Sequence, residues 1–136
     1  MPEQQIKQKI LIVDDNKDFL EIFSIKLAAV GFEVITANSG KEGIVKAKEV
    51  KPDLILLDVE MPEMSGVETL YNLKQDGSTK EMKVVFLTNY GEPQKETSWI
   101  DEKFAREAGA VDYIKKSEDL EKITDEVRRV IAQQQA

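Results

Sequence analysis

The stretch Asp53-Leu54-Ile55-Leu56-Leu57-Asp58 places four consecutive large apolar residues between two aspartates. An apolar run of this length without alternation is typical of a strand that is buried on both faces of a parallel sheet. Two further runs have the same character, Ile10-Leu11-Ile12-Val13 and Val84-Val85-Phe86-Leu87, and shorter runs lie at 34–36 and 111–114. We therefore expect five strands.

The segments between these runs carry apolar residues at helical spacing. The predicted buried stripes are Phe19, Ile22, Phe23, Leu27 and Val30, closed by Gly31; Ile44, Ala47 and Val50; Val67, Leu70 and Tyr71; Ile100, Phe104, Ala105 and Ala108; and Leu120, Ile123, Val127 and Val130. Ser39 and Ser65 each precede a glutamate by three residues, which matches the capping box at a helix start. Strands that alternate with helices predict an α/β fold, in which a parallel sheet has helices on both faces.

Length and composition limit the classes of function. The 136 residues carry a formal net charge of −7 and no cysteine or histidine. We expect a single domain over 1–136, with its core at about 8–132 and no output domain in this chain. Acidity argues against nucleic-acid binding by this domain, and the absence of a long apolar run argues against a membrane segment. Since the N-terminus also lacks the apolar centre of a secretory signal, we expect a cytoplasmic protein.

Polar residues gather where the predicted strands end. In a sheet of this kind the functional crevice lies beyond the carboxyl ends of the strands. Carboxylates that meet there raise one another's pKa, and a divalent cation such as Mg²⁺ removes that cost. A phosphoryl group would then lie between the metal and an ammonium group, which is the arrangement that phosphoryl transfer needs. The residues at the strand ends are Asp14, Asp15, Asp58, Thr88, Asn89, Lys115 and Lys116.

Simpler roles are open for the same acidic residues. Asp14 and Asp15 are also suited to capping the following helix and to its first turn, where the helix dipole favours acids. Asp58 is also suited to forming a turn before the loop that contains Pro62.

The chain resembles the receiver domain of two-component response regulators, nearest in size to the single-domain chemotaxis type. The resemblance covers roughly residues 8 to 132 and implies a flavodoxin-like, doubly wound five-stranded parallel sheet with strand order 2-1-3-4-5. The segments that carry it are Ile10 to Asn16, Asp53 to Gly66, Phe86 to Thr88 and Ala108 to Lys116.

The resemblance implies a role for each residue of the acidic group. Asp58 is the phosphoacceptor and also belongs to the metal site. Asp15 is a direct ligand of Mg²⁺, Asp14 acts largely through a metal-bound water, and Glu60 contributes its backbone carbonyl to the metal.

The resemblance also implies a switch. Lys116 contacts the phosphoryl oxygens, and Thr88 turns its hydroxyl toward them. Tyr113 changes rotamer together with Thr88, which remodels the face formed by the fourth helix, the fifth strand and the fifth helix. That face is expected to bind a downstream protein or a second copy of the chain.

Three features depart from the family pattern. Asn89 occupies a position that is usually very small, and together with Tyr90 it predicts a long-lived phosphorylated state. Ser117 replaces a proline, which predicts a trans Lys116–Ser117 peptide and Ser117 as the cap of the last helix. The segment 90–98 is longer than usual.

These observations predict a signalling receiver that accepts a phosphoryl group on Asp58 and is not an enzyme with an external substrate. Because the chain has no histidine, a phosphohistidine donor must belong to another protein, a sensor histidine kinase or a histidine phosphotransfer protein. One alternative is a phosphatase or phosphotransferase with an Asp nucleophile, of the haloacid-dehalogenase kind, since Glu60 stands two positions after Asp58. Another is a pseudo-receiver that docks without being phosphorylated.

Overall fold

The computed structural model describes residues 7–89, 106–116 and 119–134. Its centre is a five-stranded sheet with the order β2-β1-β3-β4-β5, in which all neighbouring strands are parallel. The predicted parallel sheet and its strand order are therefore confirmed. The strands are β1 (Lys9–Val13), β2 (Glu33–Ala37), β3 (Leu54–Asp58), β4 (Val84–Asn89) and β5 (Asp112–Lys116).

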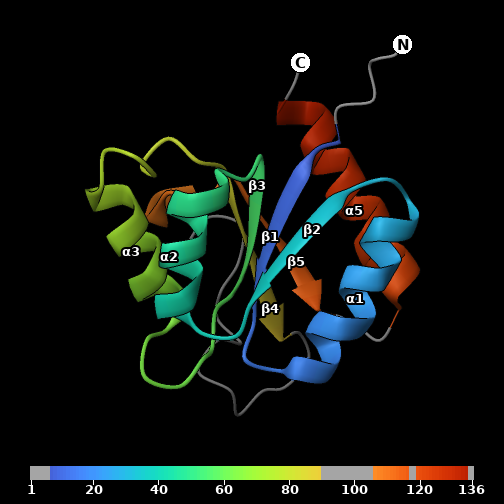
Figure 1. Ribbon diagram of the computed structural model, residues 1–136, viewed down its shortest axis with the longest axis horizontal. Coiled ribbons are helices and arrows are strands. Elements are labelled where there is room, and N and C mark those ends of the chain that lie inside the picture. Colours follow the sequence, from blue (N-terminus) through green and yellow to red (C-terminus); the bar gives the residue numbers. More distant parts are fainter. Residues whose placement is uncertain (1–6, 90–105, 117–118, 135–136) are drawn as a thin grey trace.

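Helices cover both faces of the sheet (Figure 1). One face carries α1 (Lys17–Ala29) and α5 (Leu120–Gln134), and the other carries α2 (Gly40–Val50) and α3 (Gly66–Gln75). Residues 106–108 are also helical, whereas the rest of the helix predicted around 100–108 lies outside the described residues. Within the described ranges, no helix has the length and apolar character needed to cross a membrane.

The central strands supply side chains to two cores. Leu11 and Val13 of β1 face the helices α2 and α3, whereas Ile10 and Ile12 face α1 and α5. All four are at most 1% exposed. Burial on both faces explains why these strands are apolar without alternation, as the sequence indicated.

Two of the predicted apolar stripes are wrong in part. Ile22 is 54% exposed, Val30 is 41% exposed and Tyr71 is 65% exposed, although all three were expected to face the core. Each helix buries only one side against the sheet, and α1 uses Leu20, Phe23 and Leu27 for that contact. A residue that has the helical spacing of the buried residues but lies at the border of the buried side is therefore exposed to solvent.

Asn16 begins α1, since its side chain accepts a hydrogen bond from the backbone N–H of Phe19 at 3.0 Å. The alternative in which Asp14 or Asp15 caps this helix is therefore wrong. Ser39 and Ser65 cap the helices α2 and α3 as predicted. Only Ser65 forms a reciprocal capping box, because Glu42 accepts its hydrogen bond from the backbone of Asn38 instead.

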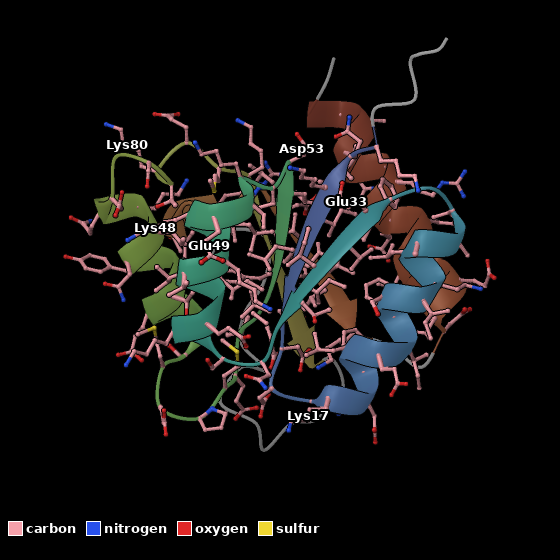
Figure 2. All side chains as sticks on the ribbon, viewed as in Figure 1. Lys17, Glu33, Lys48, Glu49, Asp53 and Lys80 are labelled. Carbon is pink, nitrogen blue, oxygen red and sulfur yellow. The ribbon has the colours of Figure 1, made fainter. Side chains whose placement is uncertain are left out.

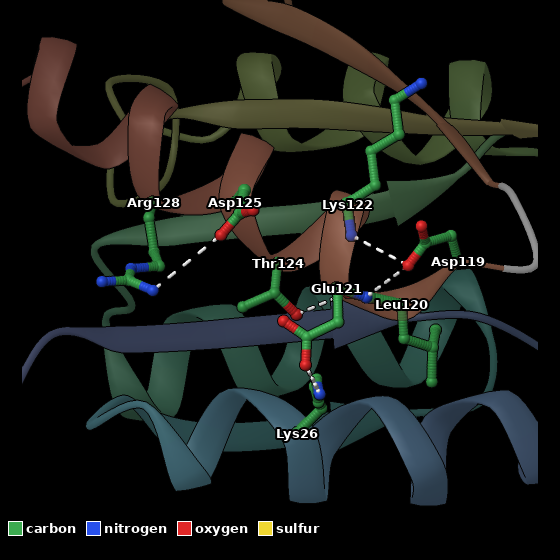
Figure 3. A network of polar contacts seen from close by, with 8 residues as sticks. All are labelled: Lys26, Asp119, Leu120, Glu121, Lys122, Thr124, Asp125 and Arg128. Carbon is green, nitrogen blue, oxygen red and sulfur yellow. Dashed lines mark hydrogen bonds and ion pairs between the residues drawn. The ribbon is translucent and has the colours of Figure 1, made fainter.

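The start of α5 is fixed by Asp119 (Figure 3). Its carboxylate accepts hydrogen bonds from the backbone N–H groups of Glu121 and Lys122, at 3.1 and 3.3 Å. The cap predicted at Ser117 is therefore wrong, and Ser117 itself, with the peptide bond that precedes it, lies outside the described residues. An ion pair between Lys26 and Glu121 joins α5 to α1.

Gly66, the first residue of α3, packs directly against the end of β3. Its N–H donates to the carbonyl of Val59 at 2.7 Å. A Cβ at this position would lie 2.2 Å from the carbonyl oxygen of Asp58 and 2.8 Å from the Cα of Val59. Since both neighbours are backbone atoms, only glycine allows α3 to begin this close to the strand.

Replacing Gly66 with alanine is expected to lower the free energy of unfolding by about 1–3 kcal/mol, because the added methyl group must displace backbone. The matched control is Gly77→Ala, since nothing lies within 4 Å of a Cβ there. That control is expected to change stability by less than about 0.5 kcal/mol. Urea denaturation measures both variants, and an equal loss in the two would contradict the close packing of Gly66.

Candidate metal centre

The candidate site lies at the carboxyl edge of the sheet. Figure 2 shows this edge near Lys17 at the start of α1, with Glu33 and Asp53 at the opposite edge. Asp14 directly follows β1, and Asp58 and Lys116 are the last residues of β3 and β5. Alternation along the strands places these three residues on the side of the sheet that faces α1 and α5.

Asp14, Asp15 and Asp58 form a compact acidic group. One carboxylate oxygen from each lies within 4.8 Å of the others. Asp14 is 0% exposed and Asp58 is 2% exposed, whereas Asp15 is exposed to solvent. The strand ends therefore bring together the three acids that the sequence singled out.

Asp14 is held firmly from two sides. Its Oδ1 atom accepts a hydrogen bond from the backbone N–H of Asn16 at 2.9 Å. Its Oδ2 atom accepts one from the ammonium of Lys116 at 2.7 Å, across 102 positions of the chain. Both oxygens of this fully buried carboxylate are thereby satisfied, and one of them by a charged partner.

Asp58 lacks this support. Its Oδ1 atom is buried and has no hydrogen-bond partner among the described residues. Burial raises the pKa of Asp58 to about 8, and the nearby charges of Asp14 and Asp15 add to this rise, while Lys116 opposes it. In the metal-free protein, Asp58 therefore holds a proton near neutral pH.

The residues at this edge suit a hard divalent cation. Three carboxylates with oxygens within 4.8 Å of one another are the kind of ligand set that Mg²⁺ takes together with waters and phosphate oxygens, and one of them, Asp58, has a buried oxygen without a hydrogen-bond partner among the described residues. A pocket of about 460 Å³ opens beside them, large enough for those additional ligands. It is lined by Asp14, Asp15, Asn16, Asp58, Glu60, Met61, Pro62 and Lys116.

The two residues of the expected switch lie on the other side of the sheet. Thr88 is 4% exposed in β4, and Tyr113 of β5 is half-buried against the core that faces α2 and α3. Phe86 pairs with Tyr113 in the register, and Thr88 lies two residues further along the same face. The structure therefore places Thr88 and Tyr113 on one face of neighbouring strands.

Asn16 had no predicted role, yet it both caps α1 and orients Asp14. An Asn immediately before a helical apolar pattern is a capping signal, and that signal was present. Met61 and Pro62 also line the pocket and were not singled out for a role. The side chain of Asn89, all of Tyr90 and the segment 90–98 lie outside what the structure describes, so the predictions made for them stay predictions.

The fold and the acidic edge together define a class of protein: a doubly wound α/β domain with a group of three carboxylates, suited to a divalent cation, at the carboxyl ends of its strands. A family model for the response regulator receiver domain matches residues 10–128. The chain belongs to this family. It is a phosphoacceptor module rather than an enzyme in the usual sense, and its acidic pocket is consistent with signalling through a phosphorylated aspartate.

The chain is also similar in sequence to individual curated proteins. The chain is 32% identical over 123 residues to the DNA-binding dual master transcriptional regulator RpaA of Synechocystis, which covers 90% of this chain and 48% of that protein. The chain thus spans about half the length of this and other curated relatives that it matches.

Solved structures show the same arrangement. A CheY-like response regulator receiver domain protein from Methanospirillum hungatei superposes with a TM-score of 0.79 at 28% identity, over 96% of this chain and 98% of that one. The response regulator TrrA from Thermotoga maritima, solved in complex with Mg²⁺ and BeF, has a TM-score of 0.70 at 30% identity, over 90% and 97% of the two chains. The acidic group of the present chain is typical of the Mg²⁺ site in receiver domains.

The raised pKa of Asp58 predicts a pH-dependent stability in the metal-free protein. Unfolded Asp58 loses its proton near pH 4, whereas folded Asp58 keeps it up to about pH 8. The contribution of Asp58 to the stability of the folded state is therefore fully present below about pH 4 and is lost as the pH rises to about 8. Between about pH 4 and pH 8, the free energy of unfolding of Asp58→Asn should therefore rise by roughly 2–5 kcal/mol relative to that of the wild type.

Urea denaturation in a chelator at several pH values measures this difference, in which the titrating groups that do not interact with Asp58 cancel. Adding Mg²⁺ should reduce the gain, because a bound cation stabilises the ionised carboxylate of the wild type. A difference between the two proteins that does not vary with pH would contradict the assignment.

Proposed function

We propose that Asp58 is the phosphoacceptor of this receiver domain. The observation that supports this most directly is the buried Oδ1 atom of Asp58, which has no hydrogen-bond partner among the described residues. It belongs to a carboxylate beside an acidic pair and in the field of the Lys116 ammonium. A buried group left in this way has a high free energy unless a ligand satisfies it.

In the proposed reaction, a carboxylate oxygen of Asp58 attacks the phosphorus atom of a phosphohistidine. The new O–P bond forms as the P–N bond of the donor breaks, and the imidazole nitrogen leaves with the electron pair and takes up a proton. The product is an acyl phosphate on Asp58. Since the attacking carboxylate must be ionised, the proton that Asp58 holds because burial raises its pKa has to leave before the transfer.

Asp14, Asp15, Asp58 and the backbone carbonyl of Glu60 would hold Mg²⁺ in this proposal. A cation held there would neutralise the crowded carboxylates and the charge that develops on the phosphoryl oxygens. Lys116 lies at the edge of the same pocket, and its ammonium would contact those oxygens from the other side. Because an ammonium carries three N–H donors and Asp14 takes one, donors remain for the phosphoryl group.

A receiver domain implies a histidine kinase as partner. The donor in the proposed reaction is such a kinase or a histidine phosphotransfer protein, since the chain itself has no histidine. We further propose that residues of about 8–132 fold as one independent unit. Support comes from the family match over 10–128 and from the two continuous cores.

Incubation with Mg²⁺ and acetyl phosphate is expected to add one phosphoryl group to the wild type, and none to Asp58→Asn. The matched control is Asp53→Asn, which removes an exposed carboxylate from the opposite edge of the sheet and should leave the reaction unchanged. Chelation of Mg²⁺ should abolish the mass increase, which intact-protein mass spectrometry measures.

The same experiment separates the alternatives. A pseudo-receiver would show no mass increase under any condition. A phosphatase with an Asp nucleophile would release phosphate from the donor continuously, at a rate far above the decay of its own acyl phosphate. A mass increase that survives in Asp58→Asn would overturn the assignment of the phosphoacceptor.

Thr88 and Tyr113 are proposed as the switch that reports phosphorylation. Both lie on the face of the sheet that looks toward α2 and α3, on neighbouring strands. A phosphoryl group shifts such a pair only by the difference between the contacts that it makes in the two packings. The output would be a changed surface at β5, at α5 and at the helix that ends near residue 108, which binds a downstream protein or a second copy.

Charges on this surface are already paired within the chain. Arg129 lies 3.8 Å from Asp112, and Arg128 lies 3.9 Å from Asp125. Both arginines are about half exposed, so these contacts are weak and break at little cost. A partner with acidic groups would therefore displace Asp112 and Asp125 from the arginines at little cost.

Thr88→Ala is expected to leave phosphorylation of Asp58 within about threefold of the wild type while it uncouples Tyr113. In the wild type, the NMR signals of the Tyr113 ring should shift when beryllofluoride and Mg²⁺ are added. In Thr88→Ala that shift should be largely lost, because no hydroxyl turns toward the phosphoryl mimic. Identical shifts in the two proteins would contradict the switch.

A further inference from the structure

The ammonium of Lys116 has a second contact besides Asp14. It lies over the aromatic ring of Phe19, 4.6 Å from the ring centroid. This distance is within the range in which the negative face of an aromatic ring attracts a cation. The side chain of Lys116 is only 14% exposed, so water screens the attraction little.

The Phe19 ring is itself held in place. Its centroid lies 5.2 Å from that of Phe23, at an interplanar angle of 32°. Phe23 is 0% exposed at the centre of the core between the sheet and α1, and Phe19 packs against the same core. The ring below Lys116 is therefore supported by the interior of the protein.

The contacts around Lys116 form a closed circuit. Asp14 accepts from the backbone of Asn16 at 2.9 Å, and Asn16 accepts from the backbone of Phe19 at 3.0 Å. The ring of Phe19 lies against Lys116, which donates back to Asp14 at 2.7 Å. Each member of this circuit is thus positioned by the member before it.

We propose that Phe19 is a positioning residue for phosphoryl transfer to Asp58, acting through the ammonium of Lys116. This inference rests on the proposed function, in which Lys116 contacts the phosphoryl oxygens. The lysine side chain is a flexible four-carbon stem, and Asp14 alone would hold the ammonium against one carboxylate. The ring attracts the ammonium without accepting a directional N–H bond, so it keeps Lys116 at the pocket and leaves donors free to turn toward a phosphoryl group.

The role of Phe19 grows when the charge of Asp14 is offset. Lys116 is attracted to Asp14 by charge. A cation at the pocket competes for the carboxylate of Asp14, and a phosphoryl group competes for the ammonium of Lys116. The attraction between the Phe19 ring and the ammonium of Lys116 remains when these ligands bind. Phe19 therefore keeps the ammonium of Lys116 at the pocket while its hydrogen bonds pass from Asp14 to the phosphoryl group.

The experiment compares Phe19→Leu, Phe19→Tyr and Phe32→Leu. Phe32→Leu is the matched control, because Phe32 packs against the same core but precedes β2 at the opposite edge of the sheet. The structural measurement is the proton NMR shift of the Lys116 ε-methylene in the metal-free protein. We expect the upfield ring-current shift in the wild type, Phe19→Tyr and Phe32→Leu, and its loss in Phe19→Leu.

The functional measurement is the rate of phosphorylation by subsaturating acetyl phosphate at saturating Mg²⁺. Phe19→Leu should lower this rate by about threefold to thirtyfold, the range that corresponds to one cation–π contact. Phe19→Tyr should restore it, and Phe32→Leu should leave it unchanged. Affinity for Mg²⁺, measured by calorimetry, should stay within about twofold in all variants, since Asp14, Asp15 and Asp58 are intact.

A double-mutant cycle with Lys116→Met excludes a merely structural effect. In the Lys116→Met background, Phe19→Leu should cause no further loss of rate, because the ammonium that the ring positions is gone. An equal loss in both backgrounds would overturn the proposal, as would an unchanged rate in Phe19→Leu. If the wild type itself is not phosphorylated, the proposed function fails and this inference fails with it, whereas an active wild type with an unaffected Phe19→Leu refutes only the role of Phe19.

Discussion

Repulsion among three carboxylates is the constraint around which this domain is arranged. Asp14, Asp15 and Asp58 bring oxygens within 4.8 Å of one another, and two of the three side chains are shielded from water. Such a group is stable only if charge is removed by protonation or balanced by cations. The metal-free protein uses both means, since Lys116 pairs with Asp14 and the pKa of Asp58 rises to about 8. The site is thereby left with one carboxylate that a ligand can still stabilise.

The parallel sheet makes this crowding possible. Asp14, Asp58 and Lys116 are far apart in sequence, yet each stands where one strand ends, and alternation turns all three to the same face. The rigid parts lie behind them: both faces of β1 and β3 are buried, and the close approach of Gly66 fixes the loop after Asp58. The stability of the core therefore keeps the mutually repelling carboxylates together at the carboxyl edge of the sheet.

Much of this could be read from the sequence, and the failures have physical causes. Unbroken apolar runs such as Leu54 to Leu57 predicted buried parallel strands, and the polar residues at their ends predicted the acidic group. Exposure of Ile22 and Tyr71 was missed because helical spacing gives a stripe but not the width of the contact that the sheet provides. Asp119 was missed as a cap because Ser117 and Asp119 both satisfy the capping rule, and only the position of the first helical turn selects one of them.

The contact between Phe19 and Lys116 shows a different limit. Within the sequence, Phe19 is one more member of an apolar stripe, and nothing in its spacing distinguishes packing against the core from packing against a cation. The distinction arises because only residues 14–16 separate β1 from α1, so that the first turn of the helix lies beside the strand ends. Its first-turn aromatic residue thus contacts both the core and the ammonium of Lys116. Asn16 sets this geometry from both directions, since one hydrogen bond ties it to Asp14 and another to the backbone of Phe19. The start of a helix therefore connects the hydrophobic core to the charge balance of the acidic edge.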